Sequence, residues 1–326
     1  MRQFTISKLL IAFLMMLCCG TAMATGYVYK GGFKYFVDTD KGEATFVDAN
    51  HKDNSKVNQK VIVADNVTLN GVKYPVTSIG SNSFGKYVRR VEIPNSVTTL
   101  ERNSFRESSI DSLVIPSSVI SVGSGSFSNC KSLVHIVLSN NITEIPTGCF
   151  MWCNSLKKII VPGSVQRIDE QAFSNCTKLT DVSISEGVTY IGPCAFAFCE
   201  ALKTISLPST MASLGSEVFD RCYQLKIIWC WAVVPPSIFS DTFFSLQSSH
   251  LYVPKISVGK YKTADEWKLF GEISDIETTN IGMVTTSSEV FEISRYSANG
   301  QLVVVPTKGL NIVKYSNGSV RKEIVK

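Results

Sequence analysis

The chain has 326 residues and a formal net charge of +5, with 32 basic and 27 acidic side chains. Loss of a predicted N-terminal leader would remove Arg2 and Lys8 and leave only a small positive excess. A balance this close to neutral argues against nucleic acid or an anionic membrane surface as the partner.

Residues 1–24 are predicted to be a signal peptide. Arg2 and Lys8 give its positive end, an unbroken apolar run covers 9–17, and Ala22-Met23-Ala24 is a small-x-small cleavage site. The run is too short for a confident membrane span, and we expect no transmembrane segment. The sequence therefore predicts an exported protein, at the cell surface or secreted, cleaved after Ala24.

Residues 25–75 lack the periodicity of the later sequence. Short β-rich runs alternate with turn signals, among them Gly31-Gly32 and the Asn70-Gly71 pair before Val72. Because a solenoid needs its open ends covered, we interpret this segment as an N-terminal β-cap.

Residues 76–254 repeat with a period of about 23. Five apolar positions are spaced 23 residues apart, and seven clear units can be aligned before a degenerate eighth; these positions are Val119, Ile142, Val165, Val188 and Met211. A fixed period in the 20–29 range with apolar residues at constant offsets is typical of a leucine-rich-repeat solenoid. Stacking turns each apolar position into a buried ladder, as for Phe84, Phe105, Phe127, Phe150, Phe173, Phe196 and Phe219.

Each unit begins with a strand pattern. Leu133-x-x-Ile136-x-Leu138 alternates apolar and variable residues, so the variable side chains must point away from the core. Ile142, Ile145 and Phe150 follow at irregular spacing, which favours a turn and a short helical segment on the far side. We therefore predict an α/β solenoid with short parallel strands on its concave face.

The unit Leu-x-x-Ile-x-Leu-Pro, followed by Ile-Gly-x-x-Ala-Phe-x-x-Cys, resembles the bacterial BspA-like (Treponema pallidum-type) leucine-rich repeats over about 76–254. The resemblance implies an exported surface protein, and several members of that family are implicated in adhesion to host matrix proteins or to other bacteria. The periodicity itself indicates only the fold.

Eight cysteines follow the leader, and five share one repeat position: Cys130, Cys153, Cys176, Cys199 and Cys222. We interpret these five as buried thiols that pack like small apolar residues. Bridging rungs of the ladder would leave odd partners, which argues against disulfides. Cys149, Cys194 and Cys230 have no assigned role.

The C-terminal region divides into three parts. Residues 255–276 carry Val258, Tyr261, Ala264, Trp267 and Phe270 at every third position, which predicts a short helix as the C-terminal cap. Residues 277–288 are polar and form a linker. In 289–326, Asn299-Gly300 and Asn317-Gly318 predict hairpins of a small β module. This tail resembles the sorting domains of type IX secretion substrates, and a β-tail without a sorting role is the alternative.

No catalytic motif is found. Gly80 to Lys86 has the spacing of a phosphate-binding loop, but Tyr87 stands where Ser or Thr would hold magnesium, and Phe84 is a ladder residue. The three histidines are not at metal-ligand spacing from a cysteine pair. We predict a protein that is not an enzyme, with no cofactor and no metal.

The variable strand positions are the candidate binding residues. Those at the C-terminal end are aromatic, and exposed Trp and Tyr are enriched in energetic hot spots of interfaces. The candidates are Trp229, Trp231, Tyr252, Ile227, His135, Lys158 and Ile160. Trp229 and Trp231 could instead pack under the Val233–Pro236 crossing and the C-terminal cap.

The leading hypothesis is a monomeric adhesion protein that binds a host or microbial protein, such as an extracellular-matrix protein, through the concave face. The alternative is a glycan-binding protein that uses Trp229, Trp231 and Tyr252.

Overall fold

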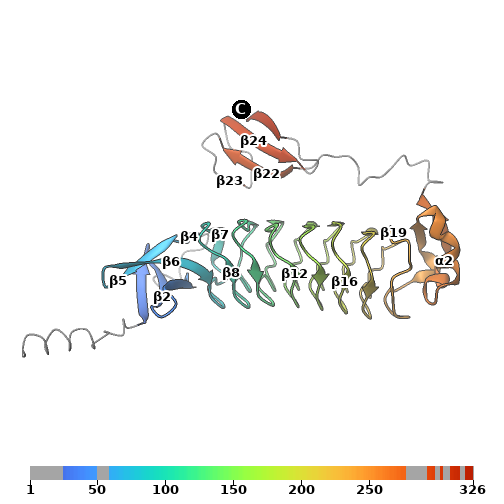
Figure 1. Ribbon diagram of the computed structural model, residues 1–326, viewed down its shortest axis with the longest axis horizontal. Coiled ribbons are helices and arrows are strands. Elements are labelled where there is room, and N and C mark those ends of the chain that lie inside the picture. The colour runs from blue at the N-terminus through green and yellow to red at the C-terminus, as the bar shows by residue number, and fades with distance from the viewer. Residues whose placement is uncertain are drawn as a thin grey trace, which may run out of the picture.

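The computed structural model describes residues 25–49 and 59–276, together with four C-terminal strands within 292–325. The predicted leader and the whole of the 277–288 linker lie outside the described residues. Between 59 and 276 the chain winds into a β-solenoid, and its coils lie side by side along one long axis (Figure 1).

One side of the solenoid is a row of strands that begin each coil. We call their solvent-facing surface the long-strand face. The members that pair run parallel, mostly with a 23-residue offset, as in Lys158↔Asp181 and Thr204↔Ile227. The strands are β4 (Gln59–Ile62), β7 (Val88–Glu92), β9 (Ser112–Val114), β11 (His135–Val137), β13 (Lys158–Val161), β15 (Asp181–Ile184), β17 (Thr204–Leu207), β19 (Ile227–Cys230), β20 (His250–Val253) and β21 (Glu272–Asp275).

A second row of strands follows each first strand after a short turn. Apart from the longer β6, these have two residues, with the second buried. They also pair in parallel, as in Ile145↔Ile168. The strands are β6 (Val72–Ile79), β8 (Thr99–Leu100), β10 (Ser121–Val122), β12 (Glu144–Ile145), β14 (Arg167–Ile168), β16 (Tyr190–Ile191) and β18 (Ser213–Leu214).

The third side of each coil consists of turns, where we expected a short helical segment. Gly148 and Trp152 both have positive φ, of +60° and +64°. A right-handed helix cannot pass through two left-handed residues four positions apart. The backbone N–H groups bond instead to the next coil, as in Phe150 N to Ala172 O at 2.7 Å and Trp152 N to Ser174 O at 2.9 Å. All three sides of a coil are therefore tied to the neighbouring coils.

The predicted phenylalanine ladder is confirmed. The seven rings stack nearly parallel, with neighbouring centroids 4.3 to 5.7 Å apart, and all are buried. Phe46 extends the stack before Phe84, and Phe243 extends it after Phe219. The ladder thus continues into the N-terminal β-cap at one end and into the degenerate eighth unit at the other.

The five ladder cysteines are also buried, and each thiol donates to the carbonyl of a phenylalanine in the preceding coil, as from Cys176 to Phe150 at 3.2 Å. All eight cysteines of the described residues are free thiols. Cys149 is buried as well, Cys230 lies 3.2 Å from the Tyr261 hydroxyl, and Cys194 is partly exposed.

At the N-terminal end, β1 (Gly26–Lys30), β2 (Phe33–Asp38) and β3 (Glu43–Asp48) form an antiparallel sheet, and β3 then pairs in parallel with β6. The sheet continues into the first coil and covers its core with Tyr35 and Phe46. β5 (Asn66–Leu69) pairs antiparallel with β6 around the Asn70-Gly71 turn, as expected for a hairpin.

At the C-terminal end, the single helix expected over 258–270 is wrong. α2 (Val258–Thr263) ends after six residues because Ala264 is extended and Glu266 has a φ of +65°. The break turns Trp267 and Phe270 into the core, and Trp267 packs edge-on against Tyr261. Three short 3-10 helices complete this end: η1 (Leu246–Ser248), η2 (Lys255–Ser257) and η3 (Trp267–Leu269).

The remaining strands form one antiparallel sheet in the order β23-β22-β24-β25. β22 pairs with β23 and β24 pairs with β25, consistent with the two hairpins expected around Asn-Gly pairs that themselves lie outside the described residues. Their bounds are β22 (Glu292–Ser297), β23 (Leu302–Val303), β24 (Gly309–Tyr315) and β25 (Val320–Val325).

Candidate functional site

The long-strand face presents two columns of outward side chains, because alternate residues of each strand point into the core. In β13, β15, β17, β19 and β20 the second and fourth residues are buried, and the first and third are at least partly exposed. The first column is His135, Lys158, Asp181, Thr204, Ile227 and His250. The second column is Val137, Ile160, Ser183, Ser206, Trp229 and Tyr252.

Three aromatic residues form a continuous stack at the C-terminal end of this face, which we call the aromatic platform: Trp229, Tyr252 and His250. Trp229 and Tyr252 are register partners on β19 and β20, and their rings stack at 4.3 Å. The His250 ring stacks on Tyr252 at 4.0 Å. Parallel pairing thus brings two predicted residues together, and His250, two residues before Tyr252 on the same strand, adds a third ring that was not predicted.

The far edge of the platform is held by β21. His250 Nδ1 lies 3.1 Å from a Glu272 carboxylate oxygen on that strand. Ile227 lies in register with His250 and is half-buried beside the platform. Tyr252 is stacked on both faces and His250 is held by Glu272, so these rings lose little conformational entropy when a ligand contacts the platform.

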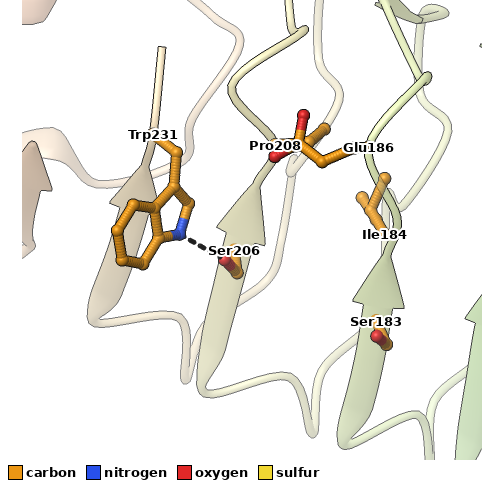
Figure 2. A pocket seen from close by; sticks show the side chains of 6 residues that line it. All are labelled: Ser183, Ile184, Glu186, Ser206, Pro208 and Trp231. Carbon is orange, nitrogen blue, oxygen red and sulfur yellow. Dashed lines mark hydrogen bonds between the residues drawn. The ribbon is translucent and has the colours of Figure 1, made fainter. Parts of the chain in front are cut away.

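Trp231 lies just beyond β19 and lines a separate pocket. Its indole N–H donates to the Ser206 hydroxyl at 3.1 Å. Figure 2 shows the ring at one side of a pocket, whose other lining residues are Ser183, Ile184, Glu186, Ser206 and Pro208. The pocket volume is about 180 Å³. The pocket combines an aromatic wall with hydroxyl and carboxylate groups.

Glu186 is the charged group of this pocket. It accepts hydrogen bonds from the Ser209 N–H at 3.0 Å, the Ser209 hydroxyl at 2.9 Å and the Thr210 N–H at 3.3 Å. Partial burial raises the pKa of Glu186, but the bonds from Ser209 and Thr210 outweigh it and hold the pKa below its usual range. The carboxylate is therefore ionised at neutral pH.

The tryptophan under the Val233–Pro236 crossing is Trp267. Its indole N–H donates to the Pro236 carbonyl at 2.7 Å, and it is 1% exposed. Trp229 and Trp231 are each half-buried on the outer surface instead. Their partial exposure leaves both available for contact.

The other three predicted residues lie toward the N-terminal half. His135 is exposed on β11, and Ile160 is half-buried on β13. Lys158 forms an exposed ion pair with Asp181 at 2.8 Å. The coils of β15 and β17, with short polar residues at most of their outward positions, separate this group from the aromatic platform. The structure thus divides the predicted set into two groups.

A second exposed aromatic group was missed because it lies in the turns. Trp152, Tyr223 and Phe244 are 44%, 51% and 52% exposed. Trp152 and Phe198 occupy the same repeat position as Asn129 and Asn175. An alignment of the turn positions of the units, in addition to the strand positions, would have revealed these exposed aromatic residues.

Within the described residues no three His, Cys, Asp or Glu side chains gather where they could hold a metal ion. None of the described helices is long and apolar enough to cross a membrane.

Comparison with known proteins places the repeats in a family. The model of the BspA-type leucine-rich-repeat region matches residues 64–176 and 143–263 with six copies, which is well over half of the chain. No curated protein matches the chain.

Solved structures with a similar fold are bacterial leucine-rich-repeat proteins. One from Bacteroides ovatus is 18% identical with a TM-score of 0.48, covering 78% of this chain and 76% of that one. One from Eubacterium ventriosum is 21% identical with a TM-score of 0.50, covering 60% and 50%. A leucine-rich cell surface protein from Faecalibacterium prausnitzii is 18% identical with a TM-score of 0.38, covering 78% and 95%.

None of these comparisons indicates a catalytic family. With its 23-residue period, its stacked phenylalanines and the match over 64–263, the chain belongs to the BspA-type leucine-rich-repeat family.

Proposed function

We propose that the chain is an exported surface protein that binds another protein, host or microbial, through its long-strand face. The single observation that carries this proposal is the aromatic platform, in which the Trp229 and Tyr252 rings stack at 4.3 Å and stay partly exposed on a rigid parallel sheet. Large aromatic side chains supply much of the binding energy at protein interfaces.

The surroundings of the platform support a protein partner. Toward the N-terminus the outward positions are short, with Thr204, Ser206 and Ser183. A partner that packs on the platform therefore meets short side chains on the strands of the next two coils, with the Trp231 ring beside Ser206. This arrangement suits an extended segment or a convex surface laid along the face.

Export rests on the leader, with its positive end, apolar run and Ala22-Met23-Ala24 site. The tail at 289–326 would then be the candidate for sorting, since its sequence resembles type IX secretion sorting domains. The binding itself leaves the partner chemically unchanged and uses no cofactor, and the protein acts as a monomer. Turnover of a substrate by the purified protein would contradict this.

The test measures binding of the purified full chain to immobilised extracellular-matrix proteins. We expect Trp229→Ala with Tyr252→Ala to lower affinity at least about tenfold, because hot-spot truncations cost about 2 kcal/mol or more. The matched control changes two exposed aromatic residues elsewhere, Tyr27 and Phe239, to alanine. An equal loss of affinity in the two double variants would refute the platform as the binding site. So would unchanged affinity in the Trp229→Ala, Tyr252→Ala variant when its melting temperature is also unchanged.

A second candidate function is glycan binding, favoured by the Trp231 pocket. An aromatic wall beside the Ser183 and Ser206 hydroxyls and the Glu186 carboxylate matches the apolar face and hydroxyl groups of a sugar ring. The ionised Glu186 disfavours acidic sugars there. Binding to a neutral polysaccharide array that is lost in Trp231→Ala and kept in Trp229→Ala would support this function, and no binding to any neutral glycan would exclude it.

A further inference from the structure

The basic side chains of the repeats gather on one edge of the solenoid. We define the turn edge as residues 129–134, 152–157, 175–180, 198–203 and 221–226, the segments that lead from the turns into the long strands. Their exposed charges are one acidic residue, Glu200, and six basic residues, Lys131, Lys157, Lys178, Lys203, Arg221 and Lys226. The net charge of these segments equals the formal +5 of the whole chain.

Most of these cations are not neutralised. Among the described residues, Lys131, Lys157, Lys178 and Lys203 have no carboxylate partner within ion-pair distance. Arg221 lies 3.6 Å from Asp220, and Lys226 donates to the Ser248 hydroxyl. The positive charges of these lysines are therefore available to an anionic ligand.

Stacking forces some of these cations into a line. Lys157, Lys203 and Lys226 share one repeat position with Thr180, and Lys226 N–H donates to the Lys203 carbonyl at 3.0 Å. Neighbouring coils are about 4.8 Å apart, so Lys203 and Lys226 repel each other. A bound anion would relieve this repulsion.

Aromatic rings are interleaved with the cations at a conformational cost. Trp152 and Phe198 adopt φ values of +64° and +62°, a region that favours Gly and Asn, and Asn129 and Asn175 fill the same position in neighbouring coils. Trp152 is 44% exposed, so core packing does not compensate the strain. Glu107 and Arg221 also have positive φ at this position, so the turn itself imposes the left-handed backbone, and Trp152 and Phe198 place exposed or partly exposed rings there.

We propose that the turn edge binds an extended anionic polysaccharide, one that carries carboxylate or sulfate groups along its length. The lysine line faces the acidic groups, and Trp152 and Tyr223 stack on sugar rings. Ser132, Ser155 and Thr177 supply hydroxyls between them. This surface is distinct from the aromatic platform and from the Trp231 pocket, so the inference stands independently of the proposed function.

Nucleic acid is the other polyanion to consider, and the predicted export of the chain favours the polysaccharide. The leader over 1–24 would take the protein out of the cell, away from cellular nucleic acids. Five of the six cations are lysine, and the single arginine is already engaged by Asp220 and by the Phe198 ring at 4.9 Å.

The experiment measures binding of the purified full chain to chondroitin sulfate, to uncharged dextran and to single-stranded DNA in 0.1 M salt. We expect binding to chondroitin sulfate alone, weakening steeply as salt rises. Lys157→Gln, Lys178→Gln and Lys203→Gln together should lower the affinity at least about tenfold and flatten the salt dependence. Trp152→Asn, which leaves the charge unchanged, should lower it about fivefold.

The matched control changes three exposed cations elsewhere, Lys73, Arg102 and Lys262, to glutamine and should bind like the parent. Equal loss in the control variant would show a general charge effect and overturn the turn edge as the site. Binding of dextran as tight as that of chondroitin sulfate would overturn the anionic ligand. DNA binding of equal affinity that is lost in the same variants would overturn the polysaccharide in favour of nucleic acid.

Discussion

The ring of Phe173 lies parallel to the ring of Phe150, with their centroids 5.3 Å apart and 4° between the planes. Phe196 stacks on its other side at 5.1 Å, and Phe173 is fully buried. Each phenylalanine is thus packed by its neighbours in the adjacent coils, and its removal leaves a gap that the two flanking coils cannot close.

We expect Phe173→Ala to lower the free energy of unfolding by about 3–5 kcal/mol through loss of burial and the cavity created. Denaturant titration of the purified protein checks this. Phe239→Ala is the matched control, since Phe239 is 58% exposed and outside the stack, and its cost should be below about 1 kcal/mol. Equal effects in the two variants would contradict a ladder that carries the stability.

The cysteine ladder predicts alkaline destabilisation. Burial raises the pKa of the Cys130, Cys176 and Cys222 thiols to about 12, against an ordinary value of 9.0. The unfolded chain therefore loses protons above pH 9 that the folded chain retains, and stability falls as pH rises from about 9 toward 12, by up to about 1.4 kcal/mol per pH unit for each thiol.

This loss is measured by denaturant unfolding between pH 7 and 10.5. The Cys176→Ala variant is less stable at pH 7, but its stability should fall less steeply with pH because one titrating group is gone. If the stability of the variant falls with pH as steeply as that of the parent, Cys176 ionises equally in the folded and unfolded states.

Trp267 closes the C-terminal core through one buried hydrogen bond to the Pro236 carbonyl. Trp267→Phe keeps an aromatic ring but leaves that carbonyl without its donor, and we expect a loss of about 1–3 kcal/mol. Thermal unfolding measures it. Trp231→Phe also removes an indole donor, but from a half-exposed site where water can replace it, and should be close to neutral.

A substitution at Trp152 is expected to stabilise the protein rather than destabilise it. Trp152→Asn should raise the free energy of unfolding by up to about 1 kcal/mol, because asparagine tolerates the left-handed backbone and the lost side chain is largely exposed. Trp152→Ala removes the ring without relieving the strain and should give no such gain. A destabilised Trp152→Asn protein would show that the ring packs more than its exposure indicates. A gain in stability with weaker polysaccharide binding would mark a trade between stability and function.

The sequence by itself determined the solenoid, its period, the phenylalanine and cysteine ladders and the side of each strand that faces solvent. These follow from local patterns repeated every 23 residues, since a buried position must be apolar in every coil that stacks on it. It also placed Trp229 and Tyr252 on the outer surface as possible binding residues.

Only the tertiary structure decided which outward residues meet. The parallel register stacks Trp229 on Tyr252, and it keeps His135, Lys158 and Ile160 apart from the platform. The break after Thr263 puts Trp267, rather than Trp229 or Trp231, beneath Pro236. Turns replaced the expected helical segments because left-handed residues recur four positions apart, a backbone property that apolar spacing does not encode. The turn edge emerges for the same reason, since its cations and rings are scattered along the chain until stacking aligns them.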